Sequence, residues 1–181
     1  YRATDISNPQ DPYGVSKMEA EKRLLALHER GVFEVVIIRP PLVYGQGVKA
    51  NFKNLMKLVE CNLPLPFGMA DSNKRSMVSV LNLVDLIILC IDHPNAGGNT
   101  FLVSDDNDLS LKELILKISL VKKKRVFLFP IPLVLMKMII TCIGKKDYAS
   151  RLFGDLQIDI DETKKLLSWE PRHTFEDTFK F

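Results

Sequence analysis

The sequence predicts an α/β protein in which some strands pair in parallel. Stretches with helical periodicity alternate with short apolar stretches typical of strands along nearly the whole chain. One of these, EVVIIR at residues 34–39, is an almost continuous apolar run, as expected for a strand that is covered on both faces. A chain of 181 residues that is 46% hydrophobic can also bury a core, so we expect one domain or one domain with a fragment of another.

The first part of the chain contains clear start and stop signals. Pro12 opens a predicted helix, Gly31 ends it, and Pro40 and Pro41 end the strand that follows. The expected elements are a helix over 12–30, a strand over 34–39, a loop with two glycines over 42–49, a helix over 50–61 and a proline-interrupted segment over 63–67.

The rest of the chain continues the alternation. Ser110 and Glu113 form a capping box, which predicts that a helix begins there. Asp85 and Trp169 are expected to have structural roles, Trp169 as an anchor in the core or at its edge. The expected elements are strands over 76–80 and 100–104, helices over 82–93 and 110–121, a strand over 126–129, and a short helix that begins at 161 and ends near 169–171.

The composition argues against several classes of site. A net charge of +3 does not require a polyanionic partner, and the basic run at 122–125 is expected to be a solvated turn, so no nucleic-acid partner is predicted. Cys61, Cys90 and Cys142 are odd in number and widely spaced, which predicts neither disulfides nor a metal cluster. The scattered histidines offer no ligand pair, so no metal site is expected. Each cysteine is expected to be a reduced core thiol, which favours the cytoplasm.

Residues 126–144, with the sequence VFLFPIPLVLMKMIITCIG, approach the length of a membrane span. Pro130, Pro132 and Lys137 interrupt this run, and its helical part, from about 132 to 143, is too short to cross a bilayer. The favoured interpretation is a helix that is buried or forms a groove. Contact with the surface of a membrane is the minority alternative.

Tyr13 and Lys17 are the strongest candidates for chemistry. They lie four residues apart in a predicted helix, so both side chains can point at the same ligand. A free phenol has a pKa of about 10, and a nearby cation favours the phenolate and brings proton exchange toward neutral pH. The pair can therefore act as an acid/base device. The same spacing also occurs by chance, with an interfacial tyrosine and a solvated lysine.

Five segments in order carry a resemblance to a known family. The chain resembles the C-terminal part of an extended short-chain dehydrogenase/reductase, and is most similar to the NAD-dependent nucleotide-sugar epimerase/dehydratase family that includes UDP-glucose 4-epimerase. The segments are Tyr13-x-x-x-Lys17, VIIRPPLVYG at 36–45, RSMVSVLNLVD at 75–85, Gly154-Asp155 and KLLSWEP at 165–171.

This resemblance implies a role for each matching residue. Tyr13 matches the catalytic acid/base, and Lys17 the lysine that holds the nicotinamide ribose and promotes ionisation of the tyrosine. Pro40 matches a position whose backbone lies along the nicotinamide end of the cofactor. The substrate side would consist of Asn51 and Arg75 at the sugar diphosphate, Leu65, Pro66 and Phe67 around the base, Asp155 near the nucleotide ribose, and Arg151 as a second phosphate ligand. Arg151 lies four residues before Asp155, where relatives often have three. Arg75 also fits on physical grounds, because a planar fork of donors suits a diphosphate.

The resemblance further implies a division of the chain. Residues 1–49 would belong to the C-terminal part of an NAD-binding Rossmann-like domain, and residues 50–181 mainly to a nucleotide-sugar-binding region, with 82–104 returning to the Rossmann-like domain. The glycine-rich NAD-binding turn and the catalytic Ser/Thr of the family are missing, and Gly45-Gln-Gly47 cannot replace that turn. We therefore expect this chain alone to be inactive and to hold NAD poorly, as part of a longer, homodimeric enzyme.

The implied activity is that of a cytoplasmic NAD-dependent 4-epimerase that converts a UDP-sugar through a 4-keto intermediate. A nucleotide-sugar 4-keto reductase or a dehydratase remains an alternative, because the residues that separate these reactions would lie upstream. A non-catalytic nucleotide-binding member of the family is a second alternative. A general interaction domain, in which the Tyr–Lys spacing has no function, is the third.

Overall fold

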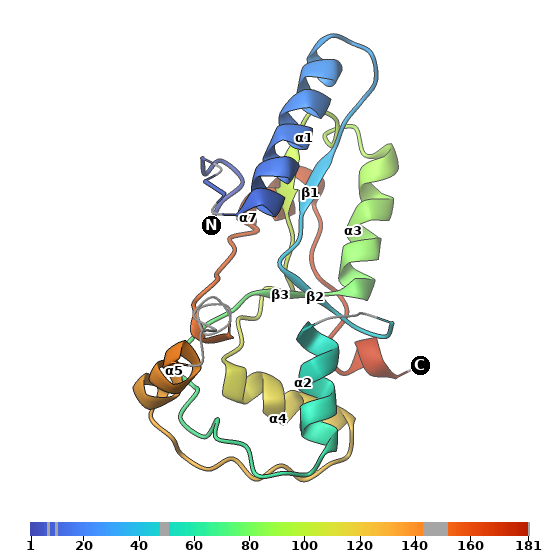
Figure 1. Cartoon of the computed structure of the whole chain (residues 1–181). Coiled ribbons are helices and arrows are strands. Elements are labelled where there is room, and N and C mark those ends of the chain that lie inside the picture. The colour runs from blue at the N-terminus through green and yellow to red at the C-terminus, as the bar shows by residue number, and fades with distance from the viewer. Residues whose placement is uncertain (7, 10, 48–50, 143–151, 181) are drawn as a thin grey trace.

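The computed structural model describes residues 1–6, 8–9, 11–47, 51–142 and 152–180, without the side chains at 51, 139 and 140. Its α1, β1, α3 and α7 lie in the upper part of Figure 1, its α2, α4 and α5 in the lower part, and β2 and β3 between them. The elements are α1 (Pro12–Glu29), β1 (Ile37–Arg39), β2 (Leu42–Tyr44), α2 (Asn51–Glu60), β3 (Met77–Ser79), α3 (Val80–Asp92), β4 (Thr100–Leu102), α4 (Leu111–Val121), α5 (Leu133–Cys142), α7 (Asp161–Leu167) and the 3₁₀ helix η1 (Asp177–Phe179).

The strands form two parallel pairs, which confirms the predicted α/β class. In one pair β1 lies beside β4, with Ile37 opposite Thr100, and in the other β2 lies beside β3, with Leu42 opposite Met77. The prediction of a loop over 42–49 was wrong at its start, because residues 42–44 form β2. The two prolines that end β1 remove backbone donors only at their own positions, so the apolar residues after them can pair again.

Local capping explains where the predicted helices begin and end. The Asp11 side chain accepts a hydrogen bond from Gly14 N (2.7 Å) at the start of α1, and Gly31, with a φ of +70°, follows its end. The capping box at α4 is confirmed, since Glu113 N donates to Ser110 Oγ (3.1 Å) and Ser110 N donates to Glu113 Oε2 (2.7 Å).

Residues 126–129 do not form the predicted strand. They make a single parallel bridge, between Leu128 and Leu65, with hydrogen bonds from Leu65 N to Phe127 O (2.9 Å) and from Phe129 N to Leu65 O (3.0 Å). Pro64 and Pro66 flank Leu65 and have no amide hydrogens to donate. The only further backbone bond between the two segments that the described residues give is from Gly68 N to Phe129 O (3.1 Å), so the pairing stays short.

The helix α5 is buried on one side only, so its interpretation as a buried helix was incomplete. Met136 is buried, whereas Val134, Leu135 and Met138 are exposed. The described residues include no helix that is both long enough and apolar enough to cross a bilayer.

Two hydrophobic clusters stabilise the fold. The lower one joins α2, α4 and α5 to β2 and β3, and the upper one packs α3 and α7 against β4. Trp169 is 2% exposed, and its Nε1 donates to Asp85 Oδ2 (2.8 Å), which confirms that these two residues have structural roles. The prediction of three core thiols was wrong for Cys61 and Cys142, which are exposed. Cys61 follows the last residue of α2, and Cys142 is the last residue of α5.

Candidate functional site

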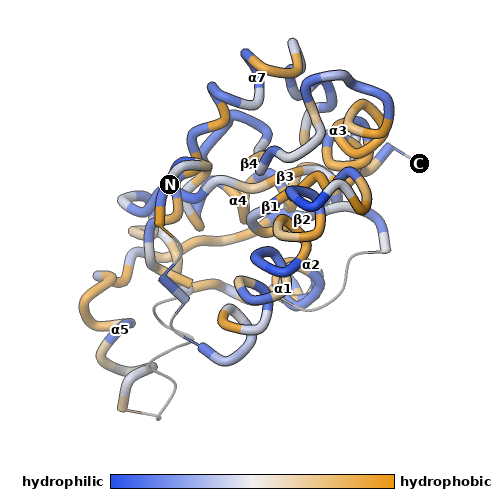
Figure 2. The backbone as a smooth tube through the Cα atoms, turned by 90° about the horizontal axis from the view of Figure 1, so that it is seen from above, coloured by the Kyte–Doolittle hydropathy of each residue, from blue (hydrophilic) through white to orange (hydrophobic). Residues whose placement is uncertain are grey.

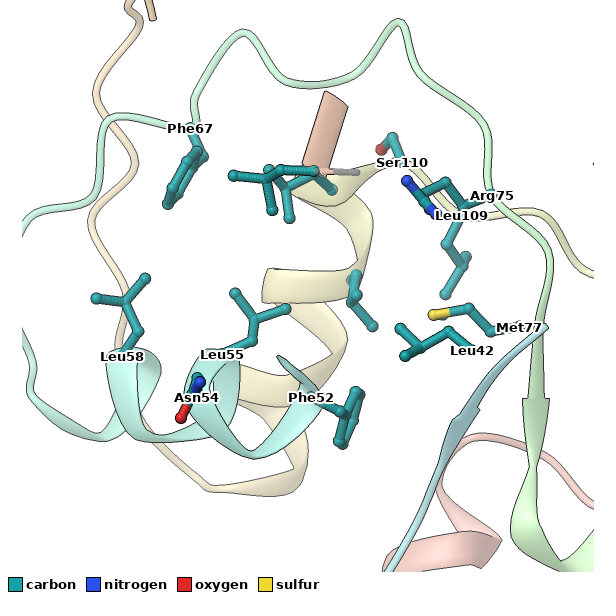
Figure 3. Close-up of a pocket in the computed structure, with 13 residues that line it drawn as sticks. Leu42, Phe52, Asn54, Leu55, Leu58, Phe67, Arg75, Met77, Leu109 and Ser110 are labelled. Carbon is teal, nitrogen blue, oxygen red and sulfur yellow. The ribbon is translucent and has the colours of Figure 1, made fainter. Parts of the chain in front are cut away.

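A pocket of about 500 Å³ lies between α2, α4 and the strands β2 and β3 (Figure 3). This volume is in the range that small-molecule ligands occupy. Most of its lining is apolar, with a few polar groups at its edge, which is the usual composition of a binding pocket. The lining residues are Leu42, Phe52, Asn54, Leu55, Leu58, Phe67, Arg75, Met77, Leu109, Ser110, Leu111, Leu114 and Leu152.

Arg75 is the charged residue of this lining. Its backbone exchanges two hydrogen bonds with Leu109 (3.0 Å each), and its Nη1 donates to Gly154 O (3.2 Å). Partial burial lowers the pKa of the Arg75 guanidinium and the nearby Asp155 carboxylate raises it, but an arginine stays protonated in either case. The backbone thus fixes a cationic fork at the edge of an apolar pocket. Such a fork suits a phosphate or a carboxylate.

The other residues predicted for the substrate side are distributed unevenly. Phe67 lines the pocket, but Leu65 is buried in the lower core and Pro66 is partly exposed outside the lining. Asp155 is exposed beside Arg75, and its Oδ1 accepts from Lys74 N (2.7 Å). Arg151 lies outside the described residues. Asn51 begins α2, and its side chain is also outside them.

Two polar residues of the lining were missed by the sequence reasoning. Asn54 lies three residues after Asn51 in α2, a spacing that places both on one side of the helix and could have suggested it. Ser110 was recognised only as the cap of α4. It lines the pocket because this helix begins beside Arg75 (Figure 3).

Tyr13 and Lys17 lie together on α1, apart from the lining of the pocket. The Lys17 Nζ is 5.6 Å from the centre of the Tyr13 ring, and the tyrosine is 71% exposed. Glu21 lies one turn further along the same face. Its carboxylate accepts hydrogen bonds from Nε (3.1 Å) and Nη2 (2.5 Å) of Arg39, which ends β1. This ion pair joins α1 to the end of β1, and α1 begins near the carboxyl end of that strand in Figure 1, where Pro40 is exposed. Ligands of open α/β folds bind at this end of the strands.

A buried network holds the strands that border the pocket. Asp105 follows β4 and accepts hydrogen bonds from Tyr44 Oη (2.5 Å), Ser79 N (2.9 Å) and Asn82 Nδ2 (2.7 Å). Burial raises the pKa of the Tyr44 hydroxyl, and the negative charge of Asp105 raises it further, so this hydroxyl remains a donor. The Tyr44 ring also packs against Phe52 of the pocket, at 5.6 Å between ring centres. The network therefore connects β2, β3 and α3 to the lining.

No group of three or more His, Cys, Asp or Glu side chains that could hold a metal ion occurs among the described residues. The chemistry available at the two clusters is proton transfer by a tyrosine paired with a lysine, and anion binding by an arginine. Tyr13, Lys17, Pro40 and Arg75 all fall within residues 2–104, which match a known family, described as the NAD dependent epimerase/dehydratase family. The chain belongs to this family.

Curated relatives support the membership. The chain is 48% identical over 180 residues to a protein of Vibrio cholerae named UDP-glucose 4-epimerase, covering 99% of the chain and 55% of that protein. It is 32% identical over 136 residues to an N-acetyl-alpha-D-glucosaminyl-diphospho-ditrans,octacis-undecaprenol 4-epimerase of Escherichia coli O157:H7, covering 71% of the chain and 41% of that protein. The chain thus spans about half the length, or less, of these members of the family.

Solved structures of epimerases share the fold. A UDP-glucose 4-epimerase of Thermotoga maritima, solved with UDP-glucose, matches with a TM-score of 0.71 at 18% identity, over 99% of this chain and 54% of that one. A UDP-glucuronic acid 4-epimerase of Bacillus cereus, in complex with NAD, matches with a TM-score of 0.72 at 18% identity, over 99% of this chain and 52% of that one. These likenesses confirm the epimerase-type α/β fold.

Proposed function

We propose that this chain forms part of an NAD-dependent 4-epimerase whose substrate is a UDP-sugar. The observation that carries the proposal is the Tyr13–Lys17 pair, which lies in the first turns of α1, a helix that the Glu21–Arg39 ion pair joins to the end of β1. A relative that is 48% identical and named UDP-glucose 4-epimerase supports the choice of reaction.

The proposed chemistry is a reversible oxidation at one carbon of the sugar. Tyr13 removes the proton of the 4-hydroxyl while the hydride of the same carbon departs, which leaves a 4-keto sugar. Return of the hydride to the opposite face and of the proton from Tyr13 gives the epimer. The Lys17 ammonium stabilises the Tyr13 phenolate, which removes the proton in the first step and forms again when the proton is returned. NAD supplies the hydride acceptor when it is bound. Tyr13, Lys17 and the backbone at Pro40 would hold its nicotinamide end.

The pocket is the proposed site of the nucleotide diphosphate. Arg75 would bind the diphosphate through its fork of donors, and Phe67 would pack against the base. Asn54 adds a polar contact that the motifs do not predict. The roles of Asn51, Leu65, Pro66, Asp155 and Arg151 at the substrate stay predictions.

The proposal applies to a protein of the length of the relatives. Residues 1–49 and 82–104 would complete a cofactor-binding domain, and most of 50–181 would contribute the substrate side. Homodimerisation and a cytoplasmic location also remain predictions. The V. cholerae relative is nearly twice as long as the matched region. This supports the proposal that further residues of such a longer protein contribute the remaining contacts to NAD.

The test is Tyr13→Phe in the full-length protein that contains this chain. The substitution keeps the ring and removes the proton carrier, so turnover of UDP-glucose or UDP-N-acetylglucosamine should fall by about 10²–10⁴, while UDP binding stays unchanged. Tyr1→Phe, another exposed tyrosine, is the matched control and should keep wild-type turnover. Near wild-type epimerisation by a folded Tyr13→Phe would eliminate Tyr13 as the acid/base.

A second substrate class has support of its own. The E. coli relative is named for a sugar diphosphate carried on a polyprenol, and a fork such as Arg75 binds any diphosphate. Ten of the thirteen lining side chains are apolar, which also suits an isoprenoid. Product analysis with both substrate classes separates these cases. It also separates epimerisation from 4-keto reduction and from dehydration, since the products differ in redox state or in loss of water.

A further inference from the structure

A set of exposed apolar side chains belongs to segments whose ribbon forms the lower edge of the molecule in Figure 1. They come from the segment after α2, from the segment after α4 and from α5, and their exposed fractions run from 48% for Leu135 to 70% for Val134. In Figure 2, α5 lies at one corner of the chain and is largely coloured hydrophobic. We call this surface the apolar edge; it consists of Leu63, Phe127, Val134, Leu135 and Met138.

The apolar edge is held in place by contacts behind it. The segments that carry Leu63 and Phe127 lie side by side, because Leu65 N donates to Phe127 O (2.9 Å) and Gly68 N donates to Phe129 O (3.1 Å). In α5, Met136 is buried in the lower core and therefore fixes the rotation of the helix. Val134 and Met138 are four residues apart, on the side away from Met136, where a helix of a water-soluble surface would carry polar residues.

The sequence from the middle of α4 to the residues after α5 contains only basic charges, and Glu60, near Leu63, is paired with Lys122. From residue 114 to residue 146 it contains no aspartate or glutamate, but it contains Lys117, which pairs with Glu176 (3.2 Å), a basic run at 122–125, Lys137 and the pair 145–146. Lys123, Lys124 and Arg125 are exposed, next to the segment that carries Phe127, whereas Lys122 is paired with Glu60 (2.7 Å). Apolar side chains beside an unbalanced positive charge suit a surface that is itself apolar and anionic.

We propose that the apolar edge binds the protein to the surface of an anionic phospholipid membrane. Its apolar side chains enter the boundary between headgroups and acyl chains, and the cations at 123–125 and Lys137 meet the phosphates. The ten residues of α5 extend only about 15 Å, half of what a bilayer core requires, so the helix lies on the membrane. This contact does not depend on the reaction proposed above, and it would place the pocket close to substrates made at a membrane.

A second exposed apolar face provides an internal comparison. On α3, Ile88 and Ile91 are as exposed as the apolar edge, but residues 80–92 contain Asp85 and Asp92 and no lysine or arginine. An anionic surface would repel this face. If exposed apolar side chains alone caused binding to lipid, the α3 face and the apolar edge would contribute equally. The proposal predicts that only the apolar edge contributes.

The test is flotation of the full-length protein with vesicles of mixed phosphatidylcholine and phosphatidylglycerol, against vesicles of phosphatidylcholine alone. The wild type should bind the mixed vesicles more strongly, and added salt should weaken that binding. The double variant V134N/M138N and the triple variant K123Q/K124Q/R125Q should each bind at least about tenfold more weakly. The control double variant I88N/I91N should bind like the wild type. Fluorescence of Trp169 and circular dichroism verify that each variant is folded.

Several results would overturn the proposal. These are absence of wild-type binding to the mixed vesicles, equal losses for V134N/M138N and I88N/I91N, and loss for the charge variant alone. A change of oligomeric state in V134N/M138N, measured by light scattering, with vesicle binding unchanged would instead make the apolar edge a contact between copies of the chain.

Discussion

The hydroxyl of Tyr44 offers a direct test of the network that holds the pocket. Tyr44→Phe removes the hydrogen bond to Asp105 (2.5 Å) in a residue that is only 1% exposed, but it keeps the ring that packs against Phe52 and Phe175. The carboxylate then loses one of three donors inside the protein. Because the buried phenylalanine ring that replaces the tyrosine offers the carboxylate no donor, the free energy of unfolding should fall.

The magnitude follows from the remaining partners. A hydrogen bond to a charged group contributes about 1.5–3 kcal/mol. Asp105 keeps Ser79 N and Asn82 Nδ2 as donors, at 2.9 and 2.7 Å, so we expect the lower half of this range, about 2 kcal/mol. For a protein of this size that loss corresponds to a decrease in Tm of about 4–8 °C.

The assay is urea unfolding followed by Trp169, the single tryptophan of the chain, which is buried in the upper core. Tyr13→Phe makes the same chemical change at an exposed position and should cost less than about 0.5 kcal/mol. Asp105→Asn should also lower the free energy of unfolding, because the amide oxygen that would accept from Ser79 N and Asn82 Nδ2 carries no charge. Equal stabilities for Tyr44→Phe and Tyr13→Phe would refute the idea that the network holds the strands.

Two further predictions concern stability. Hydrogen bonds from Ser110 hold the pKa of Glu113 below its usual value, so the charge of Glu113 stabilises the fold above its unfolded-state pKa, and that contribution is lost as the pH falls through the lower folded-state pKa. Glu113→Gln should therefore be less stable than the wild type at about pH 7 and lose less stability on acidification to about pH 3. If urea unfolding showed the same loss of unfolding free energy for both proteins between these pH values, the prediction would be wrong. Gly45 has a φ of +145°, and a Cβ there would lie 2.5 Å from Val80 Cγ1, so Gly45→Ala should cost at least about 2 kcal/mol. Gly47→Ala, with a φ of +78° and open space around it, should cost about 1 kcal/mol, and equal costs in chemical unfolding would show that the contact with Val80 is relieved.

Local signals explain which parts of the fold could be predicted. The ends of α1 and α4 depend on neighbouring residues, such as Gly31 and the pair Ser110 and Glu113, and these signals are readable in a sequence. The strand β2 depends on pairing with β3, more than thirty residues away, and it is only three residues long. The predicted strand at 126–129 failed for a related reason, since its pairing depends on Leu65, more than sixty residues away, and extends over a single bridge.

The site shows the same limit. Arg75 and Phe67 could be assigned from the order of family motifs, but Asn54 lines the pocket only because α2 packs beside α4. Asp105 has no motif of its own; its importance comes from donors on β2, β3 and α3, and Tyr44 lies 61 residues away. The side of α5 that faces away from the core likewise follows from the burial of Met136, which periodicity alone did not decide.

The central claim, that the pocket binds a nucleotide diphosphate through Arg75, is tested most directly by calorimetric titration of UDP into the full-length protein. A charge-assisted hydrogen bond contributes about 1.5–3 kcal/mol, so Arg75→Ala should bind UDP about ten- to a hundredfold more weakly. Arg75→Lys should recover only part of this loss, because an ammonium keeps the charge without the fork. Lys74→Ala removes only an exposed ion pair with Glu113 (3.4 Å) and should bind like the wild type. Equal losses at positions 74 and 75, or unchanged binding by Arg75→Ala, would contradict the account.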